Sequence, residues 1–301
     1  MKKFFLPLIV IFLSPFLFAQ KKDLRLQKKV ESLLNEFPDP AGVYVKCLRN
    51  GNVISINADT IFPTASMIKI PILTGVLDKL DKNELQYHQE LVYKDSLHYA
   101  GVDILGSFKQ DEKIELSKLI MLMLTMSDNT ASLWLQSLAG GGSRINEILD
   151  SAGFIHTRVN SRTIGREENR NVYGWGQTTP KEMVSLMEKI YLGEIISKDA
   201  CSMMLRLLGR NYWDEIANSQ IPPEIFVASK GGAVNESRSE TLLVMATNGP
   251  YIFCVATKNL QDQSWDPGNK GWVFARKLSR LLWNYFEPRY DWKPYLSVDG
   301  K

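Results

Sequence analysis

The sequence predicts an α+β fold in which one antiparallel sheet, assembled from both ends of the chain, is covered by helices. Alternating apolar segments at residues 41–59 and 226–259 predict the strands, and apolar residues at helical spacing fill the region between them. Amphipathic helical patterns also flank the strands at both chain ends. With 301 residues, 45% of them hydrophobic, the chain is long enough to bury a sizeable core.

The first third predicts a helix, a hairpin and a buried helix. Residues 21–37 repeat apolar residues at helical spacing, and prolines follow directly. Residues 41–59 alternate and turn at Asn50-Gly51-Asn52, which predicts a β-hairpin. Residues 66–80 are apolar nearly all round, so their helix should be buried. Pro71 has no N–H for the Met67 carbonyl, so we expect an irregular first turn.

The middle of the chain predicts helices, and the last third predicts strands. Helical patterns cover residues 116–126, 130–138, 143–152, 180–192 and 197–208, and we expect glycines 140–142 to end the second of these. Residues 226–233 and 239–259 predict three strands with a turn at Asn248-Gly249-Pro250, which makes five with the hairpin. Residues 271–286 predict a final amphipathic helix.

The N-terminus has the layout of a secretory signal peptide, which we place at residues 1–19. Two lysines precede an apolar stretch at residues 4–18. An uncleaved anchor is the alternative, but the stretch is short for a membrane span and contains Pro7 and Pro15. We therefore expect an exported protein, secreted or periplasmic, whose mature domain covers residues 20–301 without membrane insertion.

Composition argues against several classes of function. The net charge of +3 and the absence of a basic block with interleaved aromatics argue against nucleic-acid binding. The chain has only three cysteines, Cys47, Cys201 and Cys254, and no Cys/His cluster suited to a metal. Cys47 and Cys254 both fall in strand patterns and would be able to pair if those strands adjoin. We expect a monomer with no metal and no organic cofactor.

Ser66 and Lys69 form the first polar cluster, inside the apolar segment at residues 62–73. Residues three apart share a helix face, so the Lys69 amine can reach the Ser66 hydroxyl. Burial favours the neutral amine, which can take the serine proton and activate the nucleophile. Ser66 also lies near the start of its helix, where free N–H groups favour a developing anion. If this cluster stood alone, a surface serine and a lysine on an ordinary helix would be the more ordinary interpretation.

The second cluster is Ser127-Asp128-Asn129, which interrupts two apolar helical segments. The Ser127 hydroxyl is placed to pass a proton to a leaving amine, and the Asn129 amide is suited to bind a substrate carbonyl. Asp128 or Asn129 can also cap the following helix. The capping role and the catalytic role are compatible.

The third cluster is Lys230-Gly231-Gly232-Ala233, at the end of a strand pattern. Lys230 supplies positive charge for a substrate carboxylate, and the glycines let a ligand approach the strand edge. The N–H groups of Ala233 and Ser66 can together stabilise an oxyanion. The alternative is an edge strand with a lysine that prevents aggregation.

In this order, the three clusters resemble the motifs of the penicillin-recognising serine enzymes, and the flanking residues resemble the class A β-lactamase group over residues 24–288. The resemblance implies a sheet backed by terminal helices (residues 24–62 and 213–288), an all-helical part (residues 63–212) and a site between them. It assigns these roles: Ser66 as nucleophile, Lys69 as its proton partner, Ser127 as proton shuttle, Asn129 and Lys230 as substrate ligands, and Arg238 as a match to a carboxylate-binding arginine.

Two features depart from the family pattern. Gly231 stands where a threonine or serine is usual, so a hydroxyl that would hold the substrate carboxylate is missing. Residues 161–180 match the loop in which the family holds the glutamate that activates the deacylating water. If this loop is four residues shorter than usual, Glu167 and Asn171 have the Glu-x-x-x-Asn spacing of the family. Glu167 is our candidate for the base that activates water, Glu168 is the second, and an exposed charged loop is the alternative.

The sequence thus predicts an exported serine hydrolase of the β-lactamase type that opens a cyclic amide through an acyl-enzyme on Ser66. Its expected partner is a small β-lactam or a substrate resembling the peptidoglycan stem. A D-alanyl-D-alanine carboxypeptidase, or a related cell-wall amidase or esterase, is the first alternative. A non-catalytic cell-wall-binding relative is the second, although binding alone does not require a serine paired with a lysine.

Overall fold

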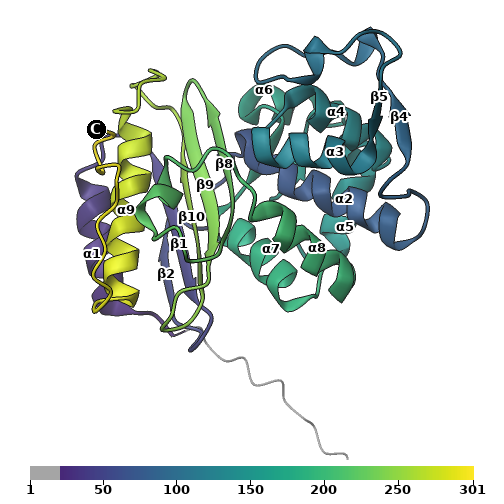
Figure 1. Cartoon of the computed structure of the whole chain (residues 1–301). Helices are drawn as coiled ribbons and strands as arrows, with labels where there is room; N and C mark the ends of the chain where they lie inside the picture. Colours follow the sequence, from purple (N-terminus) through teal and green to yellow (C-terminus); the bar gives the residue numbers. More distant parts are fainter. Residues whose placement is uncertain (1–20) are drawn as a thin grey trace, which may run out of the picture.

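The computed structural model describes residues 21–301, and the predicted α+β architecture is confirmed (Figure 1). A five-stranded antiparallel sheet has the order β2-β1-β10-β9-β8, so strands from the two chain ends lie side by side. Their bounds are β1 (Ala41–Cys47), β2 (Val53–Ile56), β8 (Val227–Val234), β9 (Ser237–Val244) and β10 (Tyr251–Thr257). The predicted turns after β1 and β9 are both present.

Helices cover both faces of the sheet. The terminal helices α1 (Leu24–Asn35) and α9 (Lys270–Phe286) lie together on one face, while the other face meets the helical part of the chain (Figure 1). Side chains alternate accordingly along each strand. In β9, Leu242 packs in the core beneath the terminal helices, whereas Leu243 packs in the core shared with the helical part.

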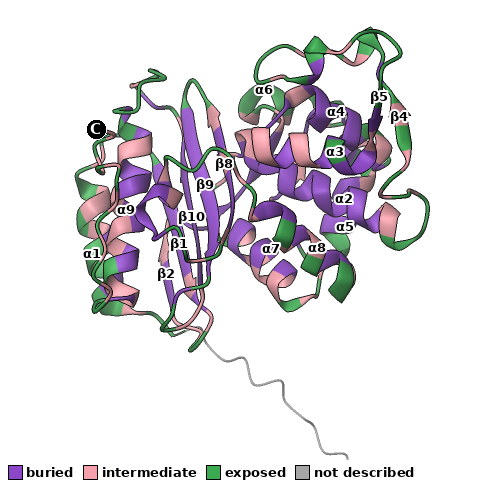
Figure 2. Ribbon diagram, in the orientation of Figure 1, coloured by how far each residue is buried: buried purple, intermediate pink, exposed green. Residues whose placement is uncertain are grey.

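The helical part is built around α2 (Lys69–Asp81). Every residue of α2 from Lys69 to Asp78 is buried, and Figure 2 shows the helix surrounded by the other helices. Its packing neighbours are α4 (Asn129–Leu138), α5 (Gly141–Ser151) and α8 (Lys198–Leu208), and the other helices of this part are α3 (Leu116–Met121), α6 (Glu167–Tyr173) and α7 (Pro180–Leu192). The expected irregular first turn before Pro71 is also present, since residues Ala65–Ile68 form a 3₁₀ turn.

Some local predictions need correction. The helix predicted over residues 116–126 changes after α3 into a π-helix, Leu122–Met126. The glycines expected to end a helix instead begin α5, and Gly140 before it has a φ of 94°. Five short strands and α6 were not predicted. The strands are β3 (Phe62–Pro63), β4 (Glu90–Val92), β5 (Lys113–Glu115), β6 (Arg158–Val159) and β7 (Gly176–Thr178).

The strand register separates the two cysteines that we considered as a pair. Cys47 of β1 lies opposite Tyr251 of β10, and Cys254 lies opposite Tyr44, so the two thiols are displaced along the strands. Cys47, Cys201 and Cys254 are all free and buried. A disulfide between Cys47 and Cys254 is therefore excluded in this fold.

The predicted signal peptide, residues 1–19, lies outside the described residues. Within residues 21–301, none of the helices combines the length and the apolar character needed to cross a bilayer. The division of the chain at residues 62/63 and 212/213 into two parts stays a prediction.

Candidate active site

Ser66 lies between the main sheet and the helical part, in the 3₁₀ turn that leads into α2. The preceding Ala65 has a left-handed backbone with a φ of 43°. On one side, the Thr64 N–H donates to the Gly176 carbonyl of β7 at 2.9 Å. On the other side, β8 packs directly on the turn, because a Cβ built on Gly232 would lie 2.4 Å from Thr64 O and 2.8 Å from Ser66 N. Ser66 is thus held between two strands.

Lys69 begins α2 and is fully buried, and its amine faces Ser66. Its Nζ lies 3.0 Å from Ser66 Oγ, 3.0 Å from Ser127 Oγ, 2.5 Å from the Ser127 carbonyl and 3.2 Å from Asn129 Oδ1. Burial lowers the pKa of Lys69 well below its usual value, and the charge of Lys230 lowers it further. The neutral amine has a lone pair that can accept the Ser66 proton.

The turn Ser127-Asp128-Asn129 follows the π-helix, and the left-handed backbone of Ser127, with a φ of 61°, turns the chain toward Lys69. Asp128 has the capping role that we considered, since its Oδ1 accepts the Ala131 N–H at 2.7 Å. Its Oδ2 accepts the Ile104 N–H at 2.5 Å. The Asp128 carboxylate therefore fixes both the start of α4 and the loop beside it.

Lys230 of β8 completes the cluster. Its buried Nζ lies 3.0 Å from Ser127 Oγ and 3.0 Å from the Gly231 carbonyl. Burial lowers the pKa of Lys230 to about 8, and the charge of Glu240 opposes that shift. Ser127 Oγ therefore lies between two amines, at 3.0 Å from each. The five side chains that we predicted to converge, Ser66, Lys69, Ser127, Asn129 and Lys230, are in one hydrogen-bonded cluster.

The two glycines of β8 differ in the space around them, which gives a matched pair of substitutions. We expect Gly232→Ala to push β8 away from the Ser66 turn, to lower the free energy of unfolding by about 1–3 kcal/mol, and to slow acylation of Ser66 by roughly 100-fold through misplacement. A Cβ on Gly231 would meet only ordinary contacts, Glu240 Cγ at 3.8 Å and Ser239 O at 3.9 Å.

Gly231→Ala is therefore the control, and its unfolding free energy should change by about 0.5 kcal/mol or less. Urea unfolding measures the stability of both variants, and stopped-flow acylation measures the rate. Equal effects of the two alanines on the acylation rate would contradict the close packing of Gly232 on the Ser66 turn.

Arg238 requires a correction, because its guanidinium is used elsewhere. It donates to the Ser237 carbonyl at 3.0 Å and the Ser264 carbonyl at 2.7 Å. It also lies between the rings of Trp265 and Trp272, 4.6 Å and 4.7 Å from their centroids. The guanidinium also donates to the Val234 carbonyl of β8, so its hydrogen bonds are at the β8–β9 hairpin and not at the Ser66 cluster.

The structure does not bring Glu167 or Glu168 to the Ser66 cluster. Both side chains are exposed at the start of α6, and Glu167 Oε1 accepts the Gly165 N–H at 3.2 Å. Asn171, which we paired with Glu167, is also exposed. Within residues 21–301, neither carboxylate makes a hydrogen bond to Ser66, Lys69, Ser127 or Asn129.

Neutral amides and one arginine face inward from this loop instead. Gln177 Oε1 of β7 accepts from Arg166 Nη2 at 2.8 Å and from Asn169 Nδ2 at 3.1 Å. Arg166 Nε also donates to Asn160 Oδ1 at 3.0 Å. Sequence reasoning missed this cluster, since an amide in a loop carries no pattern that separates an inward from an outward side chain.

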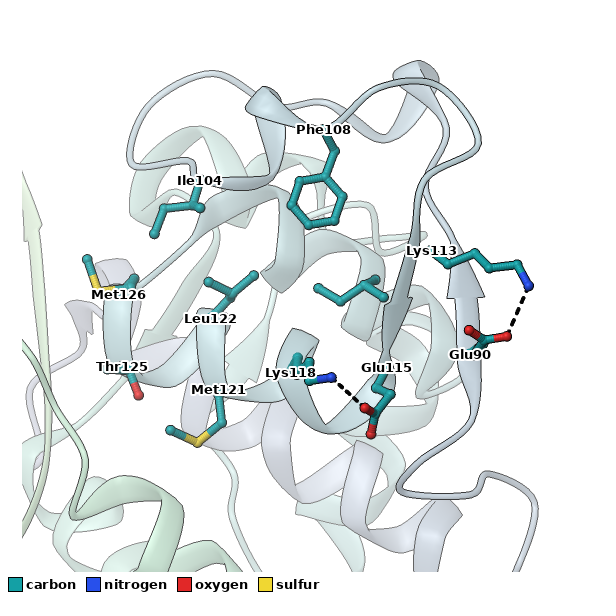
Figure 3. A pocket seen from close by; sticks show the side chains of 11 residues that line it. Glu90, Ile104, Phe108, Lys113, Glu115, Lys118, Met121, Leu122, Thr125 and Met126 are labelled. Carbon is teal, nitrogen blue, oxygen red and sulfur yellow. Dashed lines mark hydrogen bonds and ion pairs between the residues drawn. The ribbon is translucent and has the colours of Figure 1, made fainter.

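A separate cavity lies beside α3, β5 and the π-helix, and Met126 of its lining directly precedes Ser127 in the chain (Figure 3). Its volume is about 570 Å³. The lining is mainly apolar, from Ile104, Phe108, Ile114, Met121, Leu122 and Met126, and Figure 3 shows the ion pairs Glu90–Lys113 and Glu115–Lys118 at one side. None of the five clustered side chains lines this cavity, so it is distinct from the site around Ser66.

Comparison with known proteins places the chain in a family. The model of the beta-lactamase enzyme family matches residues 25–286. The chain belongs to the beta-lactamase enzyme family. As a member of this family, it is a hydrolase of the serine β-lactamase type.

Curated relatives of the family are similar over much of the chain at low identity. Beta-lactamase VEB-1 of Pseudomonas aeruginosa is 22% identical over 298 residues, which cover 95% of this chain and 98% of that protein. Beta-lactamase BRO-1 of Moraxella catarrhalis is 25% identical over 237 residues, covering 75% and 74% of the two chains.

Solved structures of the family share the fold. PBP-A superposes with a TM-score of 0.79 at 25% identity, covering 89% of this chain and 98% of that one. A mutant of PBP-A, solved as an acyl-enzyme complex with penicillin G, superposes equally well, with a TM-score of 0.79 at 24% identity and the same coverage. The TLA-1 extended-spectrum beta-lactamase superposes with a TM-score of 0.77 at 20% identity, covering 87% and 98% of the two chains.

Proposed function

We propose that this beta-lactamase family member opens a cyclic amide through a covalent acyl-enzyme on Ser66. The observation that carries the proposal is the hydrogen-bonded series of Ser66, Lys69, Ser127 and Lys230, in which Nζ–Oγ distances are all 3.0 Å. A nucleophile beside a buried amine, with a second hydroxyl between two amines, provides both a proton acceptor for the serine and a proton donor for the leaving group in acyl transfer. The substrate class is a β-lactam or a peptide resembling the peptidoglycan stem.

Acylation begins with a proton transfer within the cluster. Neutral Lys69 accepts the proton of Ser66 Oγ, and the oxygen attacks the carbonyl carbon of the cyclic amide. The N–H groups of Ser66 and Ala233 stabilise the oxyanion that forms. The ring C–N bond then breaks as the Ser127 hydroxyl donates its proton to the leaving nitrogen. Lys69 returns its proton to Ser127 Oγ, so the ester on Ser66 forms with no net change of protons.

Asn129 and Lys230 position the substrate in this scheme. Asn129 lies beside Lys69, with Oδ1 accepting from Nζ at 3.2 Å, and its amide nitrogen is available for a substrate carbonyl. Lys230 supplies positive charge for a substrate carboxylate. Because Gly231 adds no hydroxyl and Arg238 is held by backbone carbonyls, we expect the grip on that carboxylate to be weak.

A specific observation favours a second candidate function. Hydrolysis of the acyl-enzyme needs a base that activates water, and the inward side chains of the α6 loop are amides and an arginine. With slow deacylation of the β-lactam adduct the protein would behave as a penicillin-binding protein, and its turnover would be on another acyl donor, as in a D-alanyl-D-alanine carboxypeptidase or a cell-wall amidase or esterase. Fast deacylation would make it an antibiotic-resistance enzyme. In both cases, the signal-peptide pattern at residues 1–19 supports an exported, periplasmic or secreted enzyme.

One experiment tests the proposal and separates the candidates. The purified mature protein is mixed with a chromogenic cephalosporin. Absorbance follows hydrolysis of the cephalosporin, and mass spectrometry follows the adduct on Ser66. An adduct on Ser66 with rapid turnover supports a β-lactamase. A persistent adduct without turnover supports the penicillin-binding function. If Ser66 never carries an adduct with cephalosporin, penicillin or stem-peptide esters, the proposed function is wrong and the non-catalytic alternative gains support.

The exposed acids of α6 provide a further prediction. We expect Glu167→Gln and Glu168→Gln to leave the rate of deacylation within about twofold of wild type, because a solvated carboxylate without contact to the reacting groups has little effect on proton transfer. The decay of the Ser66 adduct measures that rate. A slowing of tenfold or more in one variant, with acylation unchanged, would restore that glutamate as the deacylation base.

A further inference from the structure

A short segment, residues 211–213 between α8 and β8, is hydrogen bonded to the chain on both sides of the active site. On one side, Trp213 Nε1 donates to the Met126 carbonyl at 2.9 Å. Met126 directly precedes Ser127. The proposed mechanism uses the Ser127 hydroxyl as a proton donor, so a contact that holds the Ser127 turn bears on that step.

The Ser127 turn is a strained part of the backbone that needs support from its neighbours. Ser127 has a left-handed φ of 61° and follows the π-helix Leu122–Met126, whose last two residues, Thr125 and Met126, are labelled in Figure 3. A left-handed residue other than glycine persists only where the surrounding structure holds it. The last carbonyls of a helix also have no partner within the helix. The 211–213 segment supplies donors for two of them, since the Tyr212 N–H donates to the Thr125 carbonyl at 3.1 Å.

On its other side, the 211–213 segment is hydrogen bonded to β8. Asn211 Nδ2 donates to Ser229 Oγ at 3.2 Å, and Ser229 directly precedes Lys230. β8 is the edge strand of the sheet, and side chains of successive residues point to opposite faces. The Asn211 contact therefore holds the strand from which Lys230 reaches Ser127, and not the Lys230 amine itself.

Asn211 also joins the two ends of the 211–213 segment. Its Nδ2 donates to the Trp213 carbonyl at 3.0 Å, and its Oδ1 accepts the Trp213 N–H at 3.3 Å. The contacts thus form a closed ring that includes the 3.0 Å contact between Lys230 Nζ and Ser127 Oγ. Because each contact in a closed ring limits the movement of the others, the Ser127 hydroxyl is fixed relative to β8.

We propose that Trp213 is a positioning residue that holds the Ser127 hydroxyl in place to protonate the leaving nitrogen of the substrate amide. The proposal rests on the acyl-enzyme function. As the amide C–N bond breaks, the Ser127 proton moves to the nitrogen, and the proton held by Lys69 replaces it on Ser127 Oγ. A displaced hydroxyl slows this transfer. The attack of Ser66 on the carbonyl uses Lys69 as proton acceptor and does not pass through Ser127.

Trp213→Phe tests the proposal, because it removes the Nε1 donor and keeps an aromatic ring. Two acyl donors are compared: a chromogenic cephalosporin, whose leaving nitrogen must be protonated, and a thioester of a D-alanyl stem-peptide mimic, whose thiolate leaves without a proton. We expect acylation by the cephalosporin to slow about tenfold and acylation by the thioester to stay within about twofold of wild type. Stopped-flow absorbance measures both rates. A merely structural role would slow both acyl donors equally, and that result overturns the proposal.

A double-mutant cycle shows whether Trp213 acts through Ser127. In Ser127→Ala the hydroxyl is absent, so adding Trp213→Phe should change the slow cephalosporin acylation by less than about twofold. Mass spectrometry of the Ser66 adduct follows this reaction over hours. A further tenfold loss in the double variant would show that Trp213 acts on the substrate or on the fold directly, and the positioning role would be wrong.

Tyr212 provides the matched control within the same segment. Its side chain is 60% exposed and contacts the Trp213 ring edge-on, with the ring centroids 5.2 Å apart, while its contact to Thr125 uses the backbone N–H. Tyr212→Phe therefore keeps both contacts, and its acylation rates with both acyl donors should equal those of the wild type. Slowing of the cephalosporin as large as in Trp213→Phe would contradict a role specific to the Nε1 donor.

Two further measurements keep the proposal open to refutation. If Trp213→Phe does not fold, Ser229→Ala decides, because it releases the β8 end of the segment and should slow the cephalosporin about threefold without slowing the thioester. If the wild type does not react with the thioester, a phenylboronic acid replaces it, since its adduct on Ser66 forms without a leaving nitrogen. Equal effects on both ligands, or none, overturn the proposal and leave the Ser66 adduct intact. A wild-type protein without any adduct refutes the acyl-enzyme function as well.

Discussion

Replacement of Ser66 by alanine is expected to abolish the covalent adduct and to lower β-lactam turnover by on the order of 10⁴-fold. The Ser66 hydroxyl is the nucleophile of the proposed mechanism, and the variant leaves Lys69, Ser127 and Lys230 without an atom to acylate. The fold should be retained, since Ser66 is only partly buried and, among residues 21–301, its Oγ is hydrogen bonded to Lys69 alone. Intact-protein mass spectrometry after incubation with penicillin detects the adduct, and peptide mapping assigns it.

A second serine in the same core provides the matched control. Ser132 in α4 is fully buried, and its Oγ has no hydrogen-bond partner among the described residues. Ser132→Ala therefore removes a buried hydroxyl outside the cluster, and we expect an adduct that forms at the wild-type rate. An adduct that persists in Ser66→Ala, on any other residue, would show that the nucleophile lies elsewhere.

The active-site cluster could be predicted because its residues occur in short motifs carried by long elements. The buried helix α2 and the strand β8 were both recognisable from their apolar patterns. Once those elements are placed, Lys69 and Lys230 have little freedom, because each side chain starts from a fixed backbone and is fully packed. The convergence on Ser127 then follows from the fold.

The misassigned residues depend on contacts that no local pattern carries. Arg238 is one residue into β9, and its position is decided by Trp265 and Trp272, which lie far along the chain. Glu240 was read only as part of a strand pattern, although an acid in a fully buried strand is itself a signal. The register places Glu240 opposite Gly231, and its Oε2 accepts the Ala217 N–H on the sheet face that carries Leu242.

The α6 loop shows why spacing alone does not locate a catalytic acid. Residues 167–173 form the helix α6, which we did not predict, and on it a spacing of four places Glu167 and Asn171 on one face. It does not say which face of the helix is turned inward. The hydrogen bonds of Arg166 and Asn169 to Gln177 select the opposite orientation, so Glu167 and Asn171 share the solvent face.

Replacement of Lys69 by methionine is expected to slow acylation of Ser66 by roughly 10²–10⁴-fold, the usual contribution of a positioned proton acceptor. Methionine has a similar length and suits the apolar surroundings of α2, so the Ser66 turn should stay in place. The remaining rate should lose its acidic limb, because that limb reports protonation of the Lys69 amine. Single-turnover kinetics with a chromogenic cephalosporin between about pH 5 and 9 measure the acylation rate and its acidic limb.

Stability provides an independent readout of the same titration. The pKa of Lys69 is lowered in the folded protein, so between that value and the ordinary lysine value the unfolded chain binds more protons. Wild-type stability should therefore rise with pH across this range, and Lys69→Met should lose that part of the slope. Urea unfolding at several pH values measures the unfolding free energies of wild type and Lys69→Met, and the effect of the buried lysine on their difference should be largest at the acidic end of the range.

Lys79 in the same helix is the control lysine. It is partly exposed and pairs with Glu84, away from Ser66, so Lys79→Met should keep the acylation rate and its pH profile. If Lys69→Met acylates at the wild-type rate, then another group accepts the Ser66 proton. In the described cluster the remaining amine is Lys230, which reaches Ser66 only through Ser127. An unchanged acidic limb in Lys69→Met would point to that longer path.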